Sequence, residues 1–252
     1  MRLTVLENVP LTFNVYRMTL VGDTRAITRA GQFVQVQVPG FYLRRPISVY
    51  DWMPAEKGSV TLVYKALGHG TEAMSHITPG TSLDVLTGLG NGYDIDDIAE
   101  AKAAKAPLLL GGGVGVPPLY GLCKRLIAQG KTPTVVLGFN TASEMILQSD
   151  FEVLGARTLV STVDGSVGTK GFVTDAAMLA DAFDYVYTCG PEPMLKAVYR
   201  LCDARGISGQ FSFEERMACG FGACMGCSCQ TKYGSKRICK DGPVLVKEEI
   251  VW

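Results

Sequence analysis

Hydrophobic and polar residues alternate along the first part of the chain. Val34, Val36 and Val38 alternate with Gln35 and Gln37, and this period of two is typical of a half-buried strand. Further short apolar runs occupy residues 47–50 and 60–64. Turn residues separate the runs, at Pro39-Gly40, Pro54, Lys57-Gly58 and Pro79-Gly80. Short strands at this spacing predict a small antiparallel β-barrel over residues 1–98.

The pattern changes near residue 100, after which apolar runs alternate with longer amphipathic stretches. Strands are predicted at 107–110, 134–138, 158–161 and 185–188, and helices at 117–129, 144–151, 173–182 and 192–205. Residues 101–106 predict a linker or a short helix. This alternation favours a right-handed parallel α/β sheet over residues 99–208. Residues 209–252 are cysteine-rich and predict a small, irregular third domain.

Composition excludes several classes of protein. The chain has 252 residues, of which 47% are apolar, and this is enough for a core and excludes a disordered protein. The 24 Lys and Arg balance the 24 Asp and Glu, so no basic surface is expected for nucleic acid or an anionic membrane. The uncharged stretch 106–123 carries five glycines and three prolines, which disfavours a membrane helix. The N-terminus lacks an apolar signal core, and we expect a cytoplasmic protein with reduced thiols.

Five of the eight cysteines fall between residues 219 and 239. Four of them have the C-x4-C-x2-C…C spacing of plant-type [2Fe–2S] proteins: Cys219, Cys224, Cys227 and Cys239. Glycines at 220, 222 and 226 allow the backbone to curl and to aim N–H groups at the sulfurs. The spacing predicts a [2Fe–2S] cluster held by these four thiolates.

Two alternatives remain open for this cluster of cysteines. Structural zinc also takes four thiolates, although it favours paired C-x2–4-C motifs and only one such pair is present. The other alternative is a set of spare thiols. Cys229 falls in a predicted strand at 228–231 and is left out as a ligand. Cys123 and Cys202 lie in predicted helices and are expected to be small core residues.

Two loops at the carboxyl edge of the predicted sheet indicate a nucleotide site. Residues 111–115 form a glycine-rich loop before a helix that starts near Pro117, and such a loop presents backbone amides to a pyrophosphate. The loop lacks the G-x-G-x-x-G fingerprint, and many α/β proteins have glycine loops with no ligand. The second loop, Cys189-Gly190-Pro191-Glu192-Pro193-Met194, also joins a strand to a helix.

Together these loops resemble the pyridine-nucleotide domain of the ferredoxin reductase superfamily. The G-x-G-x-x-P loop of that family matches residues 113–118, and its C-G-P-x-x-M turn matches residues 189–194. The resemblance implies that the Cys-Gly-Pro turn lies near the nicotinamide. The expected NAD-binding residues are Gly111, Gly113, Gly115, Pro117, Cys189, Gly190, Pro191 and Met194.

Residues 45–48 resemble the flavin motif of the same superfamily, R-x-[YFI]-[ST]. The resemblance assigns Arg45 to the FAD pyrophosphate, where a guanidinium fork suits a dianion, and Ile47 and Ser48 to the flavin ring. A second element, a strand end at 63–65 followed by a helix start at 68–71, resembles the family's G-x-[GS]-[ST] motif. The expected FAD-binding residues are Arg45, Pro46, Ile47, Ser48, Val63, Tyr64, Lys65, Gly70 and Thr71. His69 and His76, the only histidines, are expected to face solvent.

The C-terminal pattern narrows the resemblance to one group. Residues 214–227 and 238–244 closely resemble the electron-transfer subunits of class 1B, NAD-dependent dihydroorotate dehydrogenases. The resemblance to these subunits extends over the whole chain, including the flavin motif. Subunits of NADH-dependent ferredoxin:NADP oxidoreductases and sulfide dehydrogenases share the flavin and nucleotide motifs. That group has Asp in place of the first cluster cysteine, so Cys219 argues against it.

The resemblance implies an electron-transfer flavoprotein of pyrimidine biosynthesis. Electrons would leave dihydroorotate at the FMN of a separate catalytic subunit, cross the [2Fe–2S] cluster to FAD in this chain, and reduce NAD⁺. The expected complex is a heterotetramer of two copies of each chain. No catalytic side chain is expected, because a flavin between nicotinamide and cluster exchanges both one and two electrons. The alternatives are a reductase that serves another acceptor, of the ferredoxin:NADP oxidoreductase or oxygenase reductase type, and a zinc-stapled nucleotide-binding regulator.

Two finer expectations concern the nucleotide and the partner. No Arg stands at the strand end 135–140 and Glu144 follows it, which favours NAD(H) over NADP(H) unless this edge is only a solvated loop. Met217, Phe221 and Met225 surround the cluster loop and are expected to anchor the partner subunit. The alternative is that these three residues pack within their own domain.

Overall fold

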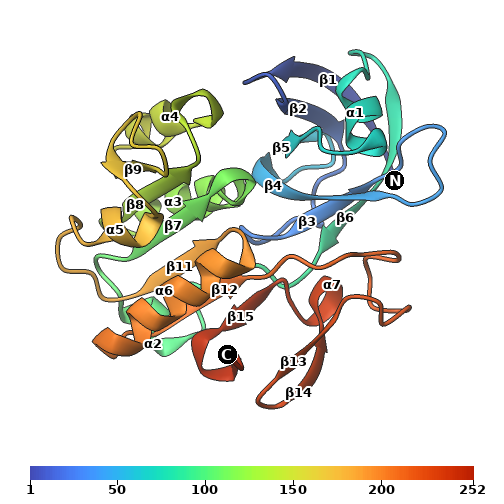
Figure 1. The fold of residues 1–252 in the computed structure, drawn as a ribbon. Coiled ribbons are helices and arrows are strands. Elements are labelled where there is room, and N and C mark those ends of the chain that lie inside the picture. The colour runs from blue at the N-terminus through green and yellow to red at the C-terminus, as the bar shows by residue number, and fades with distance from the viewer.

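The protein is described by a computed structural model that covers residues 1–252. Its N-terminal part is a closed barrel of six antiparallel strands in the order β1-β2-β5-β4-β3-β6, as the sequence predicts (Figure 1). The strands are β1 (Arg2–Pro10), β2 (Val15–Gly22), β3 (Phe33–Val36), β4 (Arg45–Met53), β5 (Gly58–Lys65) and β6 (Ser82–Leu89). One short helix, α1 (His69–Ser75), follows β5. Val34 and Val36 of β3 lie in the barrel core, as the alternation predicts. The prediction of a half-buried strand is wrong, because Gln35 is also fully buried, with its side chain against Gly220 of the cysteine-rich segment.

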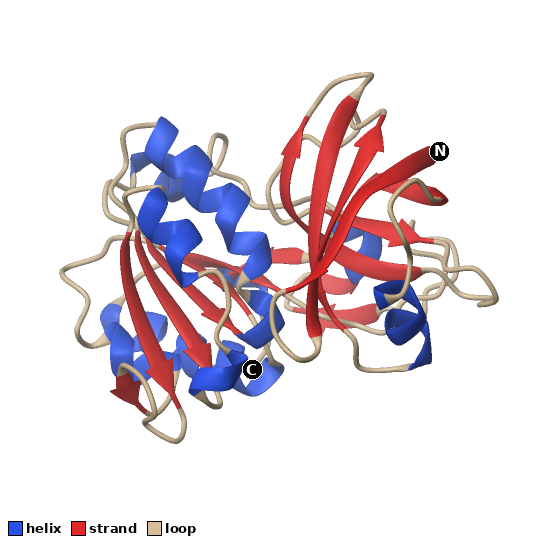
Figure 2. Cartoon of the chain, turned by 90° about the horizontal axis from the view of Figure 1, so that it is seen from above, coloured by secondary structure: helices blue, strands red, loops and turns tan.

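The second part is a seven-stranded sheet in the order β10-β9-β8-β7-β11-β12-β15, with helices on both faces (Figure 2). The first six strands of this order are parallel, which confirms the predicted α/β sheet, and β15 pairs antiparallel with β12. The strands are β7 (Leu108–Gly112), β8 (Thr134–Phe139), β9 (Arg157–Thr162), β10 (Thr169–Lys170), β11 (Val186–Cys189), β12 (Gly209–Ser212) and β15 (Val244–Val246). The helices are α2 (Ala99–Ala103), α3 (Pro117–Ala128), α4 (Gln148–Val153), α5 (Val173–Ala177) and α6 (Glu192–Arg205).

Two predicted helices are shorter than their patterns suggest. The stretch 144–151 divides into a 3-10 turn, η2 (Ala142–Glu144), and α4, because Leu147 adopts a left-handed conformation with φ 65°. Helix α5 ends at Ala177, whereas the prediction extended to residue 182. None of the helices is both long and apolar enough to cross a membrane.

The cysteine-rich segment packs against both the barrel and the α/β part. It contains a hairpin of β13 (Ser228–Thr231) and β14 (Gly234–Arg237), then α7 (Ile238–Asp241) and the 3-10 turn η3 (Lys247–Glu249). Its last strand, β15, joins the seven-stranded sheet, and Asn91 after the barrel exchanges hydrogen bonds with Val244 of that strand. The segment therefore lies against both the barrel and the sheet (Figure 1). The division at residues 98 and 208 stays a prediction, and β12 hydrogen-bonds within the sheet although it lies in the third predicted range.

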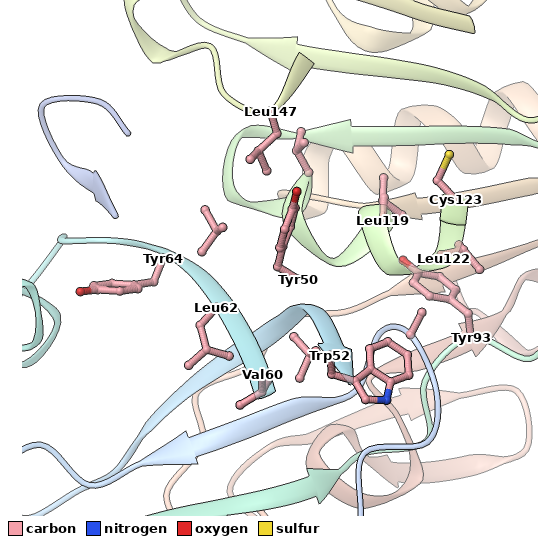
Figure 3. Packing of buried hydrophobic residues seen from close by; sticks show 14 of the residues in the cluster. Tyr50, Trp52, Val60, Leu62, Tyr64, Tyr93, Leu119, Leu122, Cys123 and Leu147 are labelled. Carbon is pink, nitrogen blue, oxygen red and sulfur yellow. The ribbon is translucent and has the colours of Figure 1, made fainter. Parts of the chain in front are cut away.

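One hydrophobic core runs from the barrel into the α/β part. Tyr50 and Trp52 of β4 lie beside Leu119 and Leu122 of α3 (Figure 3). The guanidinium of Arg125, also on α3, lies 4.1 Å from the centre of the Trp52 ring. Because β4 carries the predicted flavin motif and α3 follows the glycine loop, this packing fixes the two predicted sites relative to each other.

Candidate functional site

Arg45 and the turn before α1 lie in direct contact. A Cβ atom on Gly70 would lie 2.0 Å from Nε of Arg45, so glycine at this position makes room for the guanidinium. The guanidinium also lies 4.9 Å from the centre of the Phe41 ring. Thr71 accepts hydrogen bonds through Oγ1 from the backbone N–H groups of Leu67 and Gly68, which fixes the turn. The structure thus brings together both predicted flavin elements around a half-exposed cation that suits a pyrophosphate.

The remaining predicted flavin residues fall into two groups. Pro46, Ile47 and Ser48 lie half-exposed along β4, where a flavin ring could reach them. Val63 and Tyr64 of β5 are buried, and the Tyr64 hydroxyl donates to Oδ1 of Asn8 at 2.9 Å inside the barrel. For these two residues only the backbone could face a cofactor. Lys65 at the end of β5 is half-exposed, and both histidines are exposed.

The glycine loop packs against the Cys-Gly-Pro turn. A Cβ atom on Gly115 would lie 2.2 Å from the carbonyl oxygen of Cys189, and one on Gly112 would lie 2.5 Å from Sδ of Met194. Only glycine permits this approach of two backbones. Gly113, in the η1 turn (Gly113–Gly115), has φ 54° and no heavy atom near its Cβ position, so the tip of the loop is open. Sequence reasoning missed Gly112, whose packing against Met194 is visible only in three dimensions.

Not all predicted nucleotide residues are exposed to a ligand. Gly111 is buried beneath Val116 and Leu119, and its lack of a side chain serves the packing of α3 on the sheet. The thiol of Cys189 ends β11, and burial raises its pKa to about 12. This thiol is therefore neutral near pH 7 and presents no charge to a nicotinamide.

The carboxyl ends of β8 and β9 carry a small polar cluster. The Asn140 side chain donates to Oε2 of Glu144 at 2.8 Å, and Ser166 accepts from the backbone N–H of Ala142 at 2.8 Å. Asp164 accepts from the Ser166 hydroxyl at 2.6 Å. Sequence reasoning considered only Glu144 here. Ser166 and Asp164 were missed because a loop 20 residues away in sequence supplies them.

The four predicted cluster cysteines lie in two pairs. The sulfur of Cys219 accepts hydrogen bonds from the backbone N–H groups of Ala223 and Cys224, at 3.3 and 3.5 Å. The sulfur of Cys227 accepts from the backbone N–H of Cys239 at 3.3 Å. No three His, Cys, Asp or Glu side chains converge on the position of a single metal ion. A two-iron cluster takes its four thiolates as two pairs, one for each iron, and this donor set fits such a group.

The loop between these cysteines depends on left-handed backbone conformations. Gly220 has φ 78°, Gly222 has φ 91° and Met225 has φ 62°. These turns aim backbone N–H groups at Cys219. Burial by itself raises the pKa of a thiol, but here the backbone bonds from Cys224, Phe221 and Ala223 outweigh it and bring the pKa of Cys219 to about 6. The loop thus favours the thiolate form that binds iron.

The cysteines differ in how far they are buried. Cys227 and Cys239 are 2% exposed, whereas Cys224 is exposed. Cys123 and Cys202 are fully buried, which confirms their expected role in the core, and Cys229 lies in β13 as predicted. All eight cysteines are free thiols.

A cavity of about 720 Å³ joins the three parts of the molecule. One wall is formed by residues 43–46, which lead into β4, the strand of the predicted flavin motif (the flavin strand). Another wall is the turn at 190–192, and a third is the segment 214–217 before the first cluster cysteine. Trp252 at the end of the chain completes the wall and packs against Tyr199, Phe211 and Phe213. A planar group placed here would meet the flavin motif, the nucleotide turn and the cluster segment together. Sequence reasoning did not place Trp252 at the site, because only the pairing of β15 with β12 returns the chain end to it.

The sequence and the fold match known proteins. Residues 214–251 match the "iron-sulfur cluster binding domain of dihydroorotate dehydrogenase B", and residues 109–200 match the "oxidoreductase NAD-binding domain". The chain is 42% identical to "dihydroorotate dehydrogenase B (NAD(+)), electron transfer subunit" of Fusobacterium nucleatum, over 98% of this chain and 96% of the relative. It is 43% identical to the protein of the same name from Bacillus pumilus, with the same coverage of both.

Solved structures show the same fold. An NADH-dependent reduced ferredoxin-NADP oxidoreductase structure, described in connection with flavin-based electron bifurcation, superposes with a TM-score of 0.85 at 30% identity, over 99% of this chain and 89% of that one. The flavohem-like FAD/NAD-binding domain of nitric oxide dioxygenase from Vibrio cholerae superposes with a TM-score of 0.68 at 19% identity, over 82% and 93%. At that identity the second likeness shows the fold alone.

The barrel, the nucleotide sheet and the four-cysteine segment define an oxidoreductase of the ferredoxin reductase superfamily that uses FAD, a [2Fe–2S] cluster and NAD. Within that class, the chain belongs to the family of dihydroorotate dehydrogenase B (NAD(+)) electron transfer subunits.

Proposed function

We propose that this chain carries electrons from a dihydroorotate-oxidising catalytic subunit, through its [2Fe–2S] cluster and FAD, to NAD⁺ in pyrimidine biosynthesis. The observation that carries the proposal is the shared cavity, which the flavin strand, the Cys-Gly-Pro turn and the cluster segment line together. Electron transfer between cofactors needs such proximity more than it needs acid–base groups.

The proposed ligands are those that the sequence predicts, apart from Gly111, which lies buried beneath Val116 and Leu119. Arg45 and Gly70 would hold the FAD pyrophosphate, and residues 46–48 would line the flavin ring together with the backbone at 63–65 and Thr71. Gly113, Gly115 and Gly190 would let the nucleotide approach the backbone, beside Pro117, Pro191 and Met194. Cys219 and Cys224 would bind one iron, and Cys227 and Cys239 the other. When bound, the flavin supplies the exchange between hydride transfer and single-electron transfer.

The side chains of this chain then have binding and shielding roles. Arg45 offsets phosphate charge, the left-handed loop directs N–H groups at sulfur, and Trp252 with its aromatic neighbours covers one side of the cavity. Cys189 remains a neutral thiol at the nucleotide turn, because burial raises its pKa. We assign no catalytic acid or base in this chain.

The partner is proposed to be an FMN-containing dihydroorotate dehydrogenase, in a complex of two copies of each chain in the cytoplasm. Exposed apolar residues of the cluster loop support the docking site: Phe221 is 55% exposed and Met225 is 54% exposed. Met217 is half-buried and lines the cavity, so it is proposed to contact the cluster side of the site instead.

Co-expression with the FMN subunit tests the function. The two chains should purify together, and the mass of the complex should equal two of each. The complex should oxidise dihydroorotate with NAD⁺, whereas this chain alone should reduce artificial dyes with NADH but leave dihydroorotate unchanged. Oxidation of dihydroorotate by this chain alone would refute the assignment.

A second candidate is a reductase with another acceptor. The ferredoxin-NADP oxidoreductase likeness at 30% identity favours this class most among the alternatives. Its test is ferredoxin reduction by the purified chain with NADPH and with NADH. Turnover with ferredoxin that exceeds the dihydroorotate-linked turnover of the complex would favour the second candidate.

A further inference from the structure

Gln35 is a buried amide whose polar atoms are left unpaired by the protein. Its side chain is fully buried, and neither Nε2 nor Oε1 has a hydrogen-bond partner. Buried amides in proteins are nearly always hydrogen-bonded, since an unpaired polar group costs free energy. The position therefore needs an explanation beyond packing.

The surroundings of Gln35 place it between the flavin strand and the cluster loop. On β3 it pairs with Pro46, inside the flavin motif of β4. Its side chain lies against Gly220, the residue after the first cluster cysteine: a Cβ atom there would be 2.3 Å from Nε2 of Gln35. Phe33, two residues earlier on the same face of β3, packs in the cluster of buried residues that includes Cys227 and Cys239.

The position of the Gln35 amide explains why residue 220 is a glycine. Gly220 has φ 78° and leaves the space that the Gln35 amide occupies, next to Cys219. The Cys219 sulfur already accepts two backbone N–H groups, from Ala223 and Cys224. The Gln35 amide reaches this corner of the loop from the barrel, and its N–H groups are free to donate.

We propose that Gln35 is a positioning residue that donates a hydrogen bond from Nε2 to the [2Fe–2S] cluster at its Cys219 corner and thereby tunes the cluster's reduction potential. Hydrogen bonds to cluster sulfur stabilise the added negative charge of the reduced state, and so they raise the potential. The inference rests on the proposed cysteine ligands. It adds a contact from the flavin-binding barrel, and this contact would hold the cluster at a fixed position relative to the flavin strand.

The test compares cluster-loaded chains by redox titration monitored by electron paramagnetic resonance. Gln35→Met removes the donor and keeps similar volume, and Gln35→Leu is a second apolar variant. Gln37→Leu is the matched control, because Gln37 lies two residues further on and its amide already donates to the carbonyl of Phe41 at 2.6 Å. At the wild-type midpoint potential, the ratio of reduced to oxidised cluster should be about tenfold lower in both Gln35 variants, which corresponds to a midpoint about 59 mV lower for a one-electron couple. Gln37→Leu should stay at the wild-type value.

Thermal unfolding of the cluster-free chains separates this role from a purely structural one, because replacing an amide that stabilises the fold would lower the melting temperature. Because the protein gives Gln35 no partner, Gln35→Met should be at least as stable as wild type without the cluster. A cluster potential unchanged in both Gln35 variants would overturn the proposal. So would a Gln35→Met chain that loses its folded state by circular dichroism. A wild-type chain that binds no [2Fe–2S] cluster would instead refute the ligand set.

Discussion

Tyr50 stacks on Tyr120 across the junction between the barrel and the α/β part. The ring centroids are 4.3 Å apart with 15° between the planes, and the Tyr50 hydroxyl donates to Oδ2 of Asp150 at 2.9 Å. Tyr50 lies on the strand that begins with Arg45, and Tyr120 lies on the helix that follows the glycine loop. This pair therefore links the proposed FAD site to the proposed NAD site.

Removal of that stack should destabilise the whole chain. Tyr50→Leu loses the ring contact and leaves Asp150 without its donor, so the free energy of unfolding should fall by about 2–4 kcal/mol. Urea unfolding followed by circular dichroism measures this change. Tyr42→Leu is the control, since Tyr42 is 97% exposed and its replacement should change stability little. Equal stability of the two variants would show that the contact of Tyr50 with Tyr120 and Asp150 does not stabilise the chain.

Serine substitutions separate the cluster ligands from the spare thiol. Cys219→Ser, Cys224→Ser, Cys227→Ser and Cys239→Ser should each lose the cluster, because each removes one of four thiolates. Cys229→Ser should keep it. Iron and acid-labile sulfide analysis should give about two of each per wild-type chain. Zinc without labile sulfide, or cluster loss in Cys229→Ser, would contradict the ligand set.

Gly115→Ala should impair nucleotide binding with little effect on the flavin. The added methyl would meet the backbone carbonyl of Cys189, so the loop and the Cys-Gly-Pro turn must separate. The KM for NADH should rise at least tenfold, while the FAD content stays unchanged. Gly130→Ala is the control for general backbone strain, because Gly130 has φ 77° but no heavy atom near its Cβ position, and it follows the far end of α3 from the loop. A normal KM in Gly115→Ala would argue against this part of the site.

Glu144 should set the preference for NAD(H). Its carboxylate stands at the carboxyl end of β8, held by Asn140, where a 2′-phosphate would meet negative charge. Glu144→Arg should raise kcat/KM for NADPH at least tenfold and lower it for NADH. Glu152→Arg, on an exposed turn of α4, should leave the preference unchanged. Wild-type kinetics that favour NADPH would contradict this role of Glu144.

Charged substitutions at the cluster loop should uncouple the partner. Phe221→Asp and Met225→Asp place a charge on apolar side chains that are about half exposed, and they should weaken association with the FMN subunit at least tenfold. Dye reduction by NADH should remain, since neither residue lines the cavity. Phe13→Asp, on the barrel surface, is the control. Undiminished association would place the docking surface elsewhere.

The sequence was most informative for features that are determined by residues close together in the chain. The alternation around Val34 and Val36 predicted a barrel strand, and the spacing from Cys219 to Cys239 predicted the cluster, because neighbouring residues determine both. The motif around Arg45 was equally visible, but the contact of its guanidinium with Gly70 was not, since the two lie in different elements.

Features that depend on long-range pairing could not be predicted. Leu147 has no sequence signal for its left-handed conformation, so the break before α4 was missed. The pairing of β15 with β12 carries Trp252 to the cavity, and no local pattern reports it. Tyr64 matched a flavin element by position, whereas its side chain turns into the barrel to reach Asn8.

The most direct measurement is anaerobic NADH formation from dihydroorotate and NAD⁺ by the complex of this chain with the FMN subunit. The wild-type complex should form NADH rapidly, and the rate should fall at least a hundredfold when this chain carries Cys227→Ser. Dye reduction by NADH should survive in the same variant, because that activity needs only FAD and the nucleotide site. NADH formation that continues undiminished without the cluster would contradict the proposed route of the electrons.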